Sequence, residues 1–150
     1  ENVLNSEYAE WTAPKNAKVG DRVFFMHAVT SIDTIKRLKR ELDKSKPAFS
    51  DEDYSVLKDA LERASSIYGL YGSKVFATGK VCGDVIEDTI ARDEGLHWRS
   101  IYYAPIDSIR VLCNPVDISE FRDFIKVSRT GAITKLEPSQ VSRLNELINP

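Results

Sequence analysis

Hydrophobic positions along the chain change their spacing several times, and each spacing predicts a different element. Residues 23–28 are nearly all apolar, which is typical of a strand buried on both faces. From Ser31 the apolar residues recur at helical spacing with lysine and arginine between them, and Pro47 ends this predicted helix. A second helix is predicted to begin at Ser50, because Asp53 stands three residues on in a capping-box-like arrangement.

The second half of the chain is predicted to contain more strands. Residues 74–81 have the pattern of a strand, and residues 83–97 that of a long, acidic, turn-rich loop. Residues 98–113 are again strand-like but are expected to be broken at Pro105. The remaining expected elements are a short helix over 119–125, a turn over 128–131 and a final helix that begins at Pro138.

This order of elements predicts a single α+β domain over residues 1–150, with helices flanking a small, curved, mostly antiparallel sheet or barrel. The 150 residues suit one domain, and the hydrophobic fraction of 42% is ordinary for a globular protein. Because the first residue is Glu1 rather than Met, the chain is expected to be a piece of a longer protein. No apolar run approaches the roughly 20 residues that cross a bilayer, and no signal-peptide pattern is present. We therefore expect a cytoplasmic protein with no membrane partner, and interpret Cys82 and Cys113 as buried thiols on strands.

The patterns that usually carry catalysis or bind metal are missing from the sequence. His27 and His97 are the only histidines and match no zinc spacing, and neither cysteine forms a CxxC pair. There is no GxGxxG and no Walker loop. The acidic residues of 83–97 lack EF-hand spacing, so we interpret this loop as a solvated one. The sequence thus predicts a protein that is not an enzyme and needs no cofactor or metal.

Two tryptophans beside predicted loops, Trp11 and Trp98, are the strongest indication of a ligand. Trp11 begins the stretch Trp-Thr-Ala-Pro-Lys-Asn within residues 1–20, a segment expected to be irregular and polar. Two such rings with no nucleophile nearby indicate a flat ligand held between aromatic faces, and a nucleobase is such a ligand. The alternative is a protein-interaction or structural module in which both rings belong to the core.

Positive charge gathers locally, although the net charge of the chain is −2. Any attraction for nucleic acid must therefore come from a patch rather than from the whole molecule. The first predicted helix and its end carry six basic residues: Lys36, Arg37, Lys39, Arg40, Lys44 and Lys46. They form either a phosphate-contacting surface or an exposed face that keeps the helix soluble. Arg129, in a predicted turn, suits a bidentate grip on a phosphate.

Several of these stretches resemble a known family. Gly-Asp-Arg-Val-Phe-Phe-Met-His at 20–27, Ala-Thr-Gly-Lys-Val at 77–81, and Ser-Glu-Phe-Arg at 119–122 resemble the EVE family of the PUA-like superfamily. Ala-Ile-Thr-Lys-Leu at 132–136 and the closing helix continue the likeness, which spans roughly residues 11–148. The Trp-Thr-Ala-Pro-Lys-Asn stretch and the Arg129 turn are similar to those of the related YTH readers of methylated adenine.

The resemblance implies a PUA-like β-barrel flanked by helices and a module that binds nucleic acid, with DNA favoured over RNA. It implies recognition of a modified nucleobase, flipped out of a duplex, by the sensor domain of a modification-dependent defence or restriction protein with a fused or associated effector. The expected base-binding residues are Trp11, Thr12, His27, Trp98 and Ser100, and the expected phosphate-binding residues are Arg129, Lys36, Arg37, Lys39 and Arg40. Of Tyr102 and Tyr103, which alternate along a strand, one should face inward in a core role.

Overall fold

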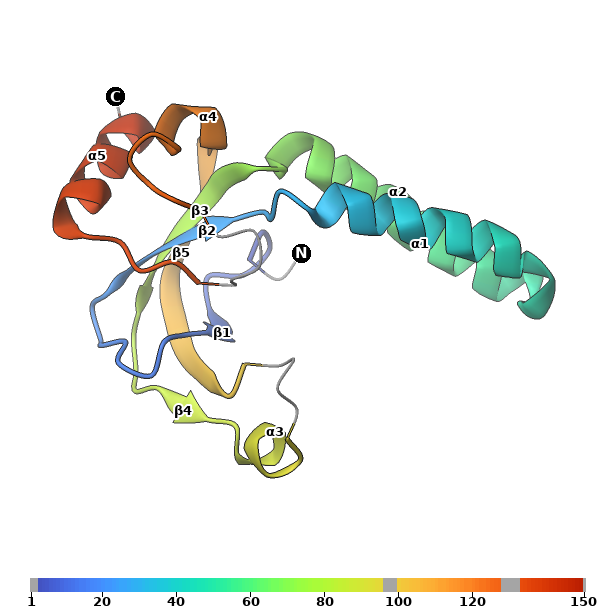
Figure 1. The fold of residues 1–150 in the computed structure, drawn as a ribbon, viewed down its shortest axis with the longest axis horizontal. Helices are drawn as coiled ribbons and strands as arrows, with labels where there is room; N and C mark the ends of the chain where they lie inside the picture. Colours follow the sequence, from blue (N-terminus) through green and yellow to red (C-terminus); the bar gives the residue numbers. More distant parts are fainter. Residues whose placement is uncertain (1–2, 96–99, 128–132, 150) are drawn as a thin grey trace. The chain divides into compact units, whose positions relative to one another are not determined.

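The computed structural model describes residues 3–95, 100–127 and 133–149 (Figure 1). The chain divides into two compact units. The first, here called the sheet unit, comprises Glu1–Phe25 and Val75–Pro150, and the second, the hairpin unit, comprises Met26–Lys74. The predicted α+β class is confirmed, because one unit carries the sheet and the other is mainly helical.

Five strands make one sheet, in the order β1-β5-β3-β2 with β4 paired to β5 outside this path. The strands are β1 (Ala9–Thr12), β2 (Arg22–Met26), β3 (Lys74–Val81), β4 (Ile86–Glu87) and β5 (Tyr102–Asp117). The strand-like runs predicted at 23–28, 74–81 and 98–113 contain most of β2, all of β3 and most of β5, and these three strands belong to the same sheet. Both β1 and β4 run antiparallel to β5. Within the described residues β1 and β2 are the two sheet edges, so the sheet is open and no closed barrel forms.

Strand β1 lies where the sequence predicted irregular chain, so that prediction is wrong for residues 9–12. Four residues carry too little alternation to indicate a strand, and their order comes from a distant partner. Ala9 stands opposite Ile106, and Trp11 stands opposite Ala104 on β5. The tryptophan expected in a loop is therefore held on a strand.

Strand β5 is continuous through Pro105, where a break was predicted. Proline lacks an N–H, so a strand tolerates it only where no neighbouring strand needs a hydrogen bond from that residue. Strand β3 ends at Val81, and this condition is met at Pro105. The Pro105 carbonyl accepts a hydrogen bond from the N–H of Cys82 at 2.9 Å, and Cys82 already lies beyond the end of β3. Further along, Ser108 has a positive φ of 51°, and the buried positions change from Ile106 to Ile109 across it. This is the phase change that an inserted bulge residue produces.

Small and branched apolar side chains fill the core of the sheet unit. One cluster of buried residues joins four strands or their flanks, namely Val3, Ala9, Phe25, Ala77, Ile106 and Ile109. A second cluster contains Ala13, Val81 and Ala104. Two helices, α4 (Ile118–Phe121) and α5 (Pro138–Ile148), add the buried side chains of Phe121 and Leu144. The prediction of a terminal helix from Pro138 is confirmed.

The acidic segment expected to be a loop contains β4 and a short helix, α3 (Thr89–Asp93). Asp88 caps this helix, because its carboxylate accepts a hydrogen bond from the N–H of Ala91 at 2.9 Å. Among the described residues, no group of three or more His, Cys, Asp or Glu could hold a metal ion.

The hairpin unit consists of α1 (Ser31–Ser45), a 3-10 turn η1 (Lys46–Ala48) and α2 (Asp51–Tyr71). Both helices match the predicted ones. The Ser50 hydroxyl oxygen accepts a hydrogen bond from the N–H of Asp53 at 3.1 Å, which confirms the predicted start of α2. The Tyr54 hydroxyl donates to the Asp43 carboxylate at 2.9 Å and so ties α2 to the end of α1.

Two further expectations concern the cysteines and the membrane. Both thiols are free, with Cys82 half-buried and Cys113 exposed. The predicted burial is wrong for Cys113, because the side chains of β5 between Ile109 and Val116 are largely uncovered. In the part of the chain that the structure describes, no helix is both long and apolar enough to span a bilayer.

Candidate functional site

Trp11 is anchored on the core side of β1 and is still largely open to solvent. Its ring meets Phe25 edge-to-face, with ring centroids 5.6 Å apart and an interplanar angle of 89°. Phe25 is itself only 4% exposed, so one partner of this contact belongs to the core. Trp11 keeps 43% of its surface exposed, whereas Ala9 and Ala13 on the same side of the strand are buried. The Trp11 side chain is therefore held in place by Phe25 and is also exposed to solvent.

The register of β1 with β5 places a second aromatic residue on the same face. Trp11 stands opposite Ala104, and the N–H of Ala13 donates to the carbonyl of Tyr102 at 3.1 Å. Because side chains alternate along a strand, Tyr102 shares the face of Ala104 and is a diagonal neighbour of Trp11. The Lys15 ammonium lies over the Tyr102 ring, 5.7 Å from its centroid. We call Trp11, Ala13, Tyr102 and Ala104 the aromatic face.

Polar groups border the aromatic face on the β4 side. Glu87 stands opposite Tyr102, and its carboxylate lies 3.2 Å from the guanidinium of Arg92. The Asp93 carboxylate accepts a hydrogen bond from Arg92 at 2.9 Å, and this bond, together with Glu87, raises the pKa of Arg92. A carboxylate and a permanently charged guanidinium thus stand beside an aromatic ring, and these are groups that can read the edge of a base.

The structure does not bring Thr12 to this face. Thr12 stands opposite Tyr103, and residues that alternate along a strand point to opposite sides of the sheet. The structure therefore does not bring the Thr12 side chain to the face of Trp11, and its predicted role in hydrogen-bonding a ligand there gains no support. The sequence indicated that one of Tyr102 and Tyr103 faces inward, and the register places Tyr102 on the face of Trp11.

Ser100 lies near the aromatic face, with its hydroxyl already in use. The Ser100 hydroxyl donates to the Tyr102 carbonyl at 2.9 Å and accepts from the Tyr102 N–H at 3.4 Å. These two bonds fix the start of β5, so Ser100 positions Tyr102 more directly than it could read a base.

His27 belongs to the hairpin unit, at its base. Its N–H donates to the Lys74 carbonyl, and its carbonyl accepts from the Ser73 N–H, both at 3.2 Å. Its ring meets Tyr68 edge-to-face at 5.4 Å. Within the described residues, the buried Nδ1 of His27 has no hydrogen-bond partner. These contacts give His27 a place in the hairpin unit and do not link it to Trp11.

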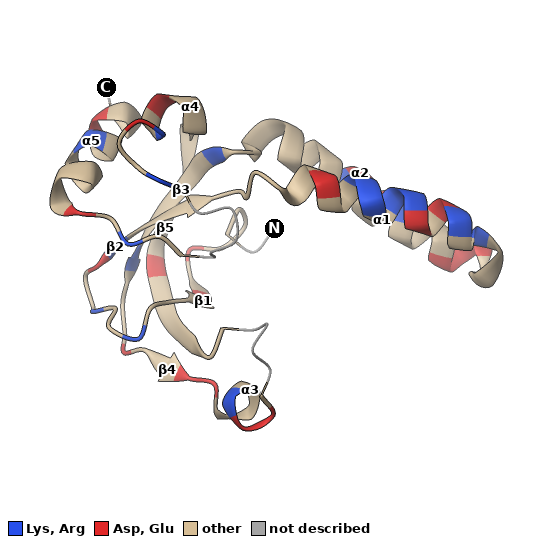
Figure 2. Cartoon of the chain, viewed as in Figure 1, with Lys and Arg blue, Asp and Glu red and all other residues tan. Residues whose placement is uncertain are grey.

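Four of the five expected phosphate-binding residues lie along α1, whose basic residues are blue in Figure 2. Lys36, Arg37 and Arg40 are exposed, and Lys39 is half-buried. The contact between Arg37 and Glu41 is 3.9 Å long and joins two well-exposed side chains, so it contributes little stability and leaves the cation available. Trp98 and Arg129 lie outside the described residues.

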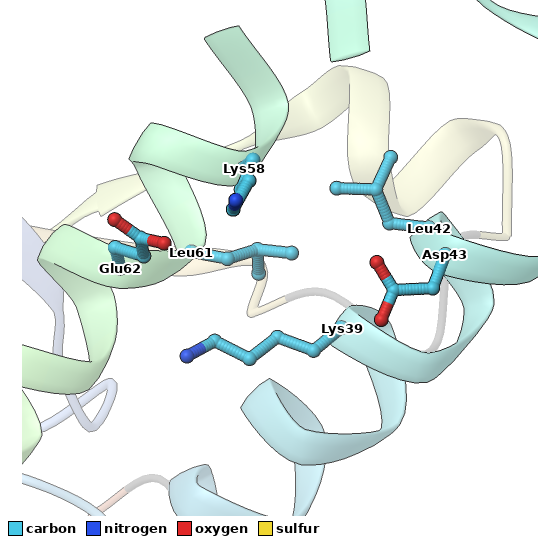
Figure 3. Close-up of a pocket in the computed structure, with 6 residues that line it drawn as sticks. All are labelled: Lys39, Leu42, Asp43, Lys58, Leu61 and Glu62. Carbon is cyan, nitrogen blue, oxygen red and sulfur yellow. The ribbon is translucent and has the colours of Figure 1, made fainter. Parts of the chain in front are cut away.

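A shallow depression lies between the two helices of the hairpin unit (Figure 3). It is lined by Lys39, Leu42, Asp43, Lys58, Leu61 and Glu62. Its volume of about 110 Å³ is well below the roughly 300–1,000 Å³ of typical small-molecule sites. Four of its six lining residues are charged, so we do not assign it a ligand.

This chain matches no protein-family model, no curated protein and no solved structure. Its function must therefore be argued from its own residues.

Proposed function

We propose that this chain is a non-catalytic nucleic-acid-binding module of PUA-like, EVE type, which holds a modified nucleobase against the aromatic face. The exposed ring of Trp11, fixed by Phe25 and flanked by Tyr102, is the observation that carries the proposal. Rigid aromatic rings suit a flat ligand, and the exposed part of the Trp11 ring offers such a surface, whereas Ala13 and Ala104 on the same face are buried in the core.

The free energy of base stacking favours an aromatic site for binding a nucleobase that is flipped out of a duplex. Stacking a base on an aromatic side chain contributes on the order of 1–3 kcal/mol. Taking a base out of a duplex costs a few kcal/mol, which stacking and contacts to the base edge must offset. In this proposal Glu87 and Arg92 supply the edge contacts beside Tyr102, and Trp98 forms a second wall as the family resemblance implies.

Phosphate contacts add affinity that does not depend on sequence. We assign them to the basic residues of α1 and, by the family resemblance, to Arg129. The net charge of −2 makes a local patch necessary. DNA is the favoured nucleic acid, and the wider role is that of a sensor domain in a modification-dependent defence protein with an attached or associated effector.

The competing function is a protein-interaction or structural module with both tryptophans in the core. A core role predicts a buried Trp11, and the 43% exposure of this side chain favours a ligand instead. An exposed Trp11 is also compatible with a module that binds a peptide. Binding measurements are therefore needed to distinguish nucleic-acid binding from protein binding.

A panel of DNA and RNA oligonucleotides, each carrying one type of modified base, tests the proposal. We expect at least one modified oligonucleotide to bind more tightly than its unmodified counterpart. Trp11→Ala should erase this preference, and Tyr8→Ala, which removes another exposed aromatic ring just before β1, should keep it. Circular dichroism of each variant shows that the domain stays folded. No binding to any nucleic acid, or a preference that survives Trp11→Ala, would overturn the proposal.

A further inference from the structure

The chain leaves β1 through a tight turn whose two ends are held by the core of the sheet unit. The N–H of Ala17 donates to the carbonyl of Pro14 at 3.0 Å and so closes a β-turn. Ala13, just before the turn, is buried, and its N–H donates to the carbonyl of Tyr102 at 3.1 Å. Ala17, at the end of the turn, packs on the core cluster that contains Ala13. The turn is therefore fixed, and Lys15 at its tip is exposed.

Lys15 brings a positive charge to the rim of the aromatic face. Its ammonium lies over the Tyr102 ring, 5.7 Å from the ring centroid, because the face of an aromatic ring attracts a cation. Tyr102 is held by two hydrogen bonds with the Ser100 hydroxyl, and Trp11 is its diagonal neighbour on the same face. The cation and the exposed Trp11 ring therefore lie close together within the sheet unit.

The charge of Lys15 is not balanced by an ion pair among the described residues. Glu87, which stands opposite Tyr102, lies 3.2 Å from the guanidinium of Arg92, and Asp93 contacts the same guanidinium at 2.9 Å. Both carboxylates beside the aromatic face are therefore already paired with a different cation. An ammonium has three donors, and a contact with an exposed ring satisfies none of them fully. Lys15 can therefore bind an anion that arrives with the ligand.

A nucleotide within a chain carries such an anion at a short distance from its base. The phosphodiester groups on both sides of the nucleotide are joined to the base through the sugar. A base that stacks on Trp11 therefore brings phosphate to the rim of the aromatic face. A free base or a nucleoside brings no charged group. Lysine contacts to phosphate position a nucleic acid, whereas contacts to the base distinguish one base from another.

We propose that Lys15 binds a phosphate that flanks the base held on Trp11, so that the site takes a nucleotide within a chain and not a free base or nucleoside. This inference rests on the proposed function, because it needs a base on the aromatic face. It adds a phosphate contact in the sheet unit, next to the base, to the contacts assigned to α1 of the hairpin unit. Because both ends of the turn are already fixed by the core, the contact requires little ordering of the backbone.

A double-mutant cycle between the protein and the nucleic acid tests this inference. The probe is the modified oligonucleotide that the panel of modified bases selects. It is also made with an uncharged methylphosphonate at one or the other linkage beside the modified base. We expect Lys15→Ala to weaken binding of the unaltered probe on the order of tenfold. One of the two methylphosphonates should weaken wild-type binding by a similar factor and should have little further effect on Lys15→Ala, because both changes remove the same contact.

Two variants serve as controls. Lys15→Arg keeps a cation at the tip of the turn and should retain most of the affinity. Lys18→Ala removes another exposed lysine between β1 and β2 and should keep the full effect of the methylphosphonate. Circular dichroism shows that each variant is folded.

The outcomes separate this inference from the proposed function. Wild-type affinity in Lys15→Ala would overturn the inference, and so would methylphosphonate effects that simply add to that of Lys15→Ala at both linkages. The proposed function would still stand if Trp11→Ala erased the preference for the modified base. A panel that selects no oligonucleotide would overturn both.

Discussion

The sheet unit and the hairpin unit are stabilised in different ways. Of the seventeen buried apolar residues in the described chain, fifteen lie in the sheet unit and two, Ile35 and Leu42, in the hairpin unit. The sheet unit is ordered by side chains from distant strands that fill a common core. The hairpin unit is ordered mainly by local signals, such as the Ser50 cap and the bond between Tyr54 and Asp43. A substitution that adds a side-chain atom should therefore change the free energy of unfolding differently in the two units.

The largest expected contrast comes from the same substitution made once in each unit. A Cβ at Gly79 on β3 would lie 2.7 Å from Cγ2 of Ile106 and 3.3 Å from Cε2 of Phe25. We expect Gly79→Ala to lower the free energy of unfolding by about 1–3 kcal/mol. A Cβ at Gly69 in α2 would meet nothing within 4 Å, so Gly69→Ala should raise the stability by about 0.5–1 kcal/mol. Urea unfolding followed by circular dichroism measures the free energy of unfolding of both variants. If both substitutions raised it, or both lowered it, the contrast between the units would be contradicted.

The second prediction separates the roles of the units in binding. Replacing Lys36 and Arg40 together with alanine should weaken modified and unmodified oligonucleotides alike and reduce the salt dependence by about two units of slope. Titrations at two salt concentrations measure the effect, with Lys80→Ala on β3 as a control for the loss of an exposed cation. If the affinity and its salt dependence did not change, Lys36 and Arg40 would not contact phosphates and would serve only as solvated surface residues.

The smallest expected effect is a pH dependence confined to the hairpin unit. The hydrogen bond to Asp43 raises the pKa of Tyr54 above its ordinary value. The folded state therefore holds this proton more tightly than the unfolded chain. The contribution is complete below the ordinary tyrosine pKa of about 10 and disappears as the pH rises through the higher folded value. Tyr54→Phe should lower the melting temperature slightly at pH 7, and the difference from wild type should vanish at alkaline pH. A difference that grows with pH would contradict this sign.

Local signals in the sequence were enough to predict much of the fold. The caps and apolar spacing of α1 and α2, and the apolar run of β3, indicate their elements directly, because each is determined by residues a few positions apart. The strand β1 could not be found in this way, since its four residues take their order from β5. The continuity of β5 through Pro105 also depends on residues far away in the sequence, because β3 ends just before the residue that lies opposite the proline.

The candidate site shows the same division. Trp11 could be singled out from composition and its neighbours alone. Its partner Tyr102 could not, because only the register of β1 with β5 shows which tyrosine shares the face of Trp11. That register also moves Thr12 to the opposite face. Alternation along a known strand would have separated Trp11 from Thr12, but the strand itself was not predicted.

The central claim, that a base stacks on Trp11, is tested most directly by comparing Trp11→Ala with Trp11→Phe. The quantity to measure is the difference in binding free energy between a modified oligonucleotide and its unmodified counterpart. If stacking carries recognition, Trp11→Ala should lose about 1–3 kcal/mol of this difference, or roughly five- to 150-fold in relative affinity. Trp11→Phe, which keeps an aromatic face, should retain most of it. Two folded variants that both discriminate as well as the wild type would contradict the account.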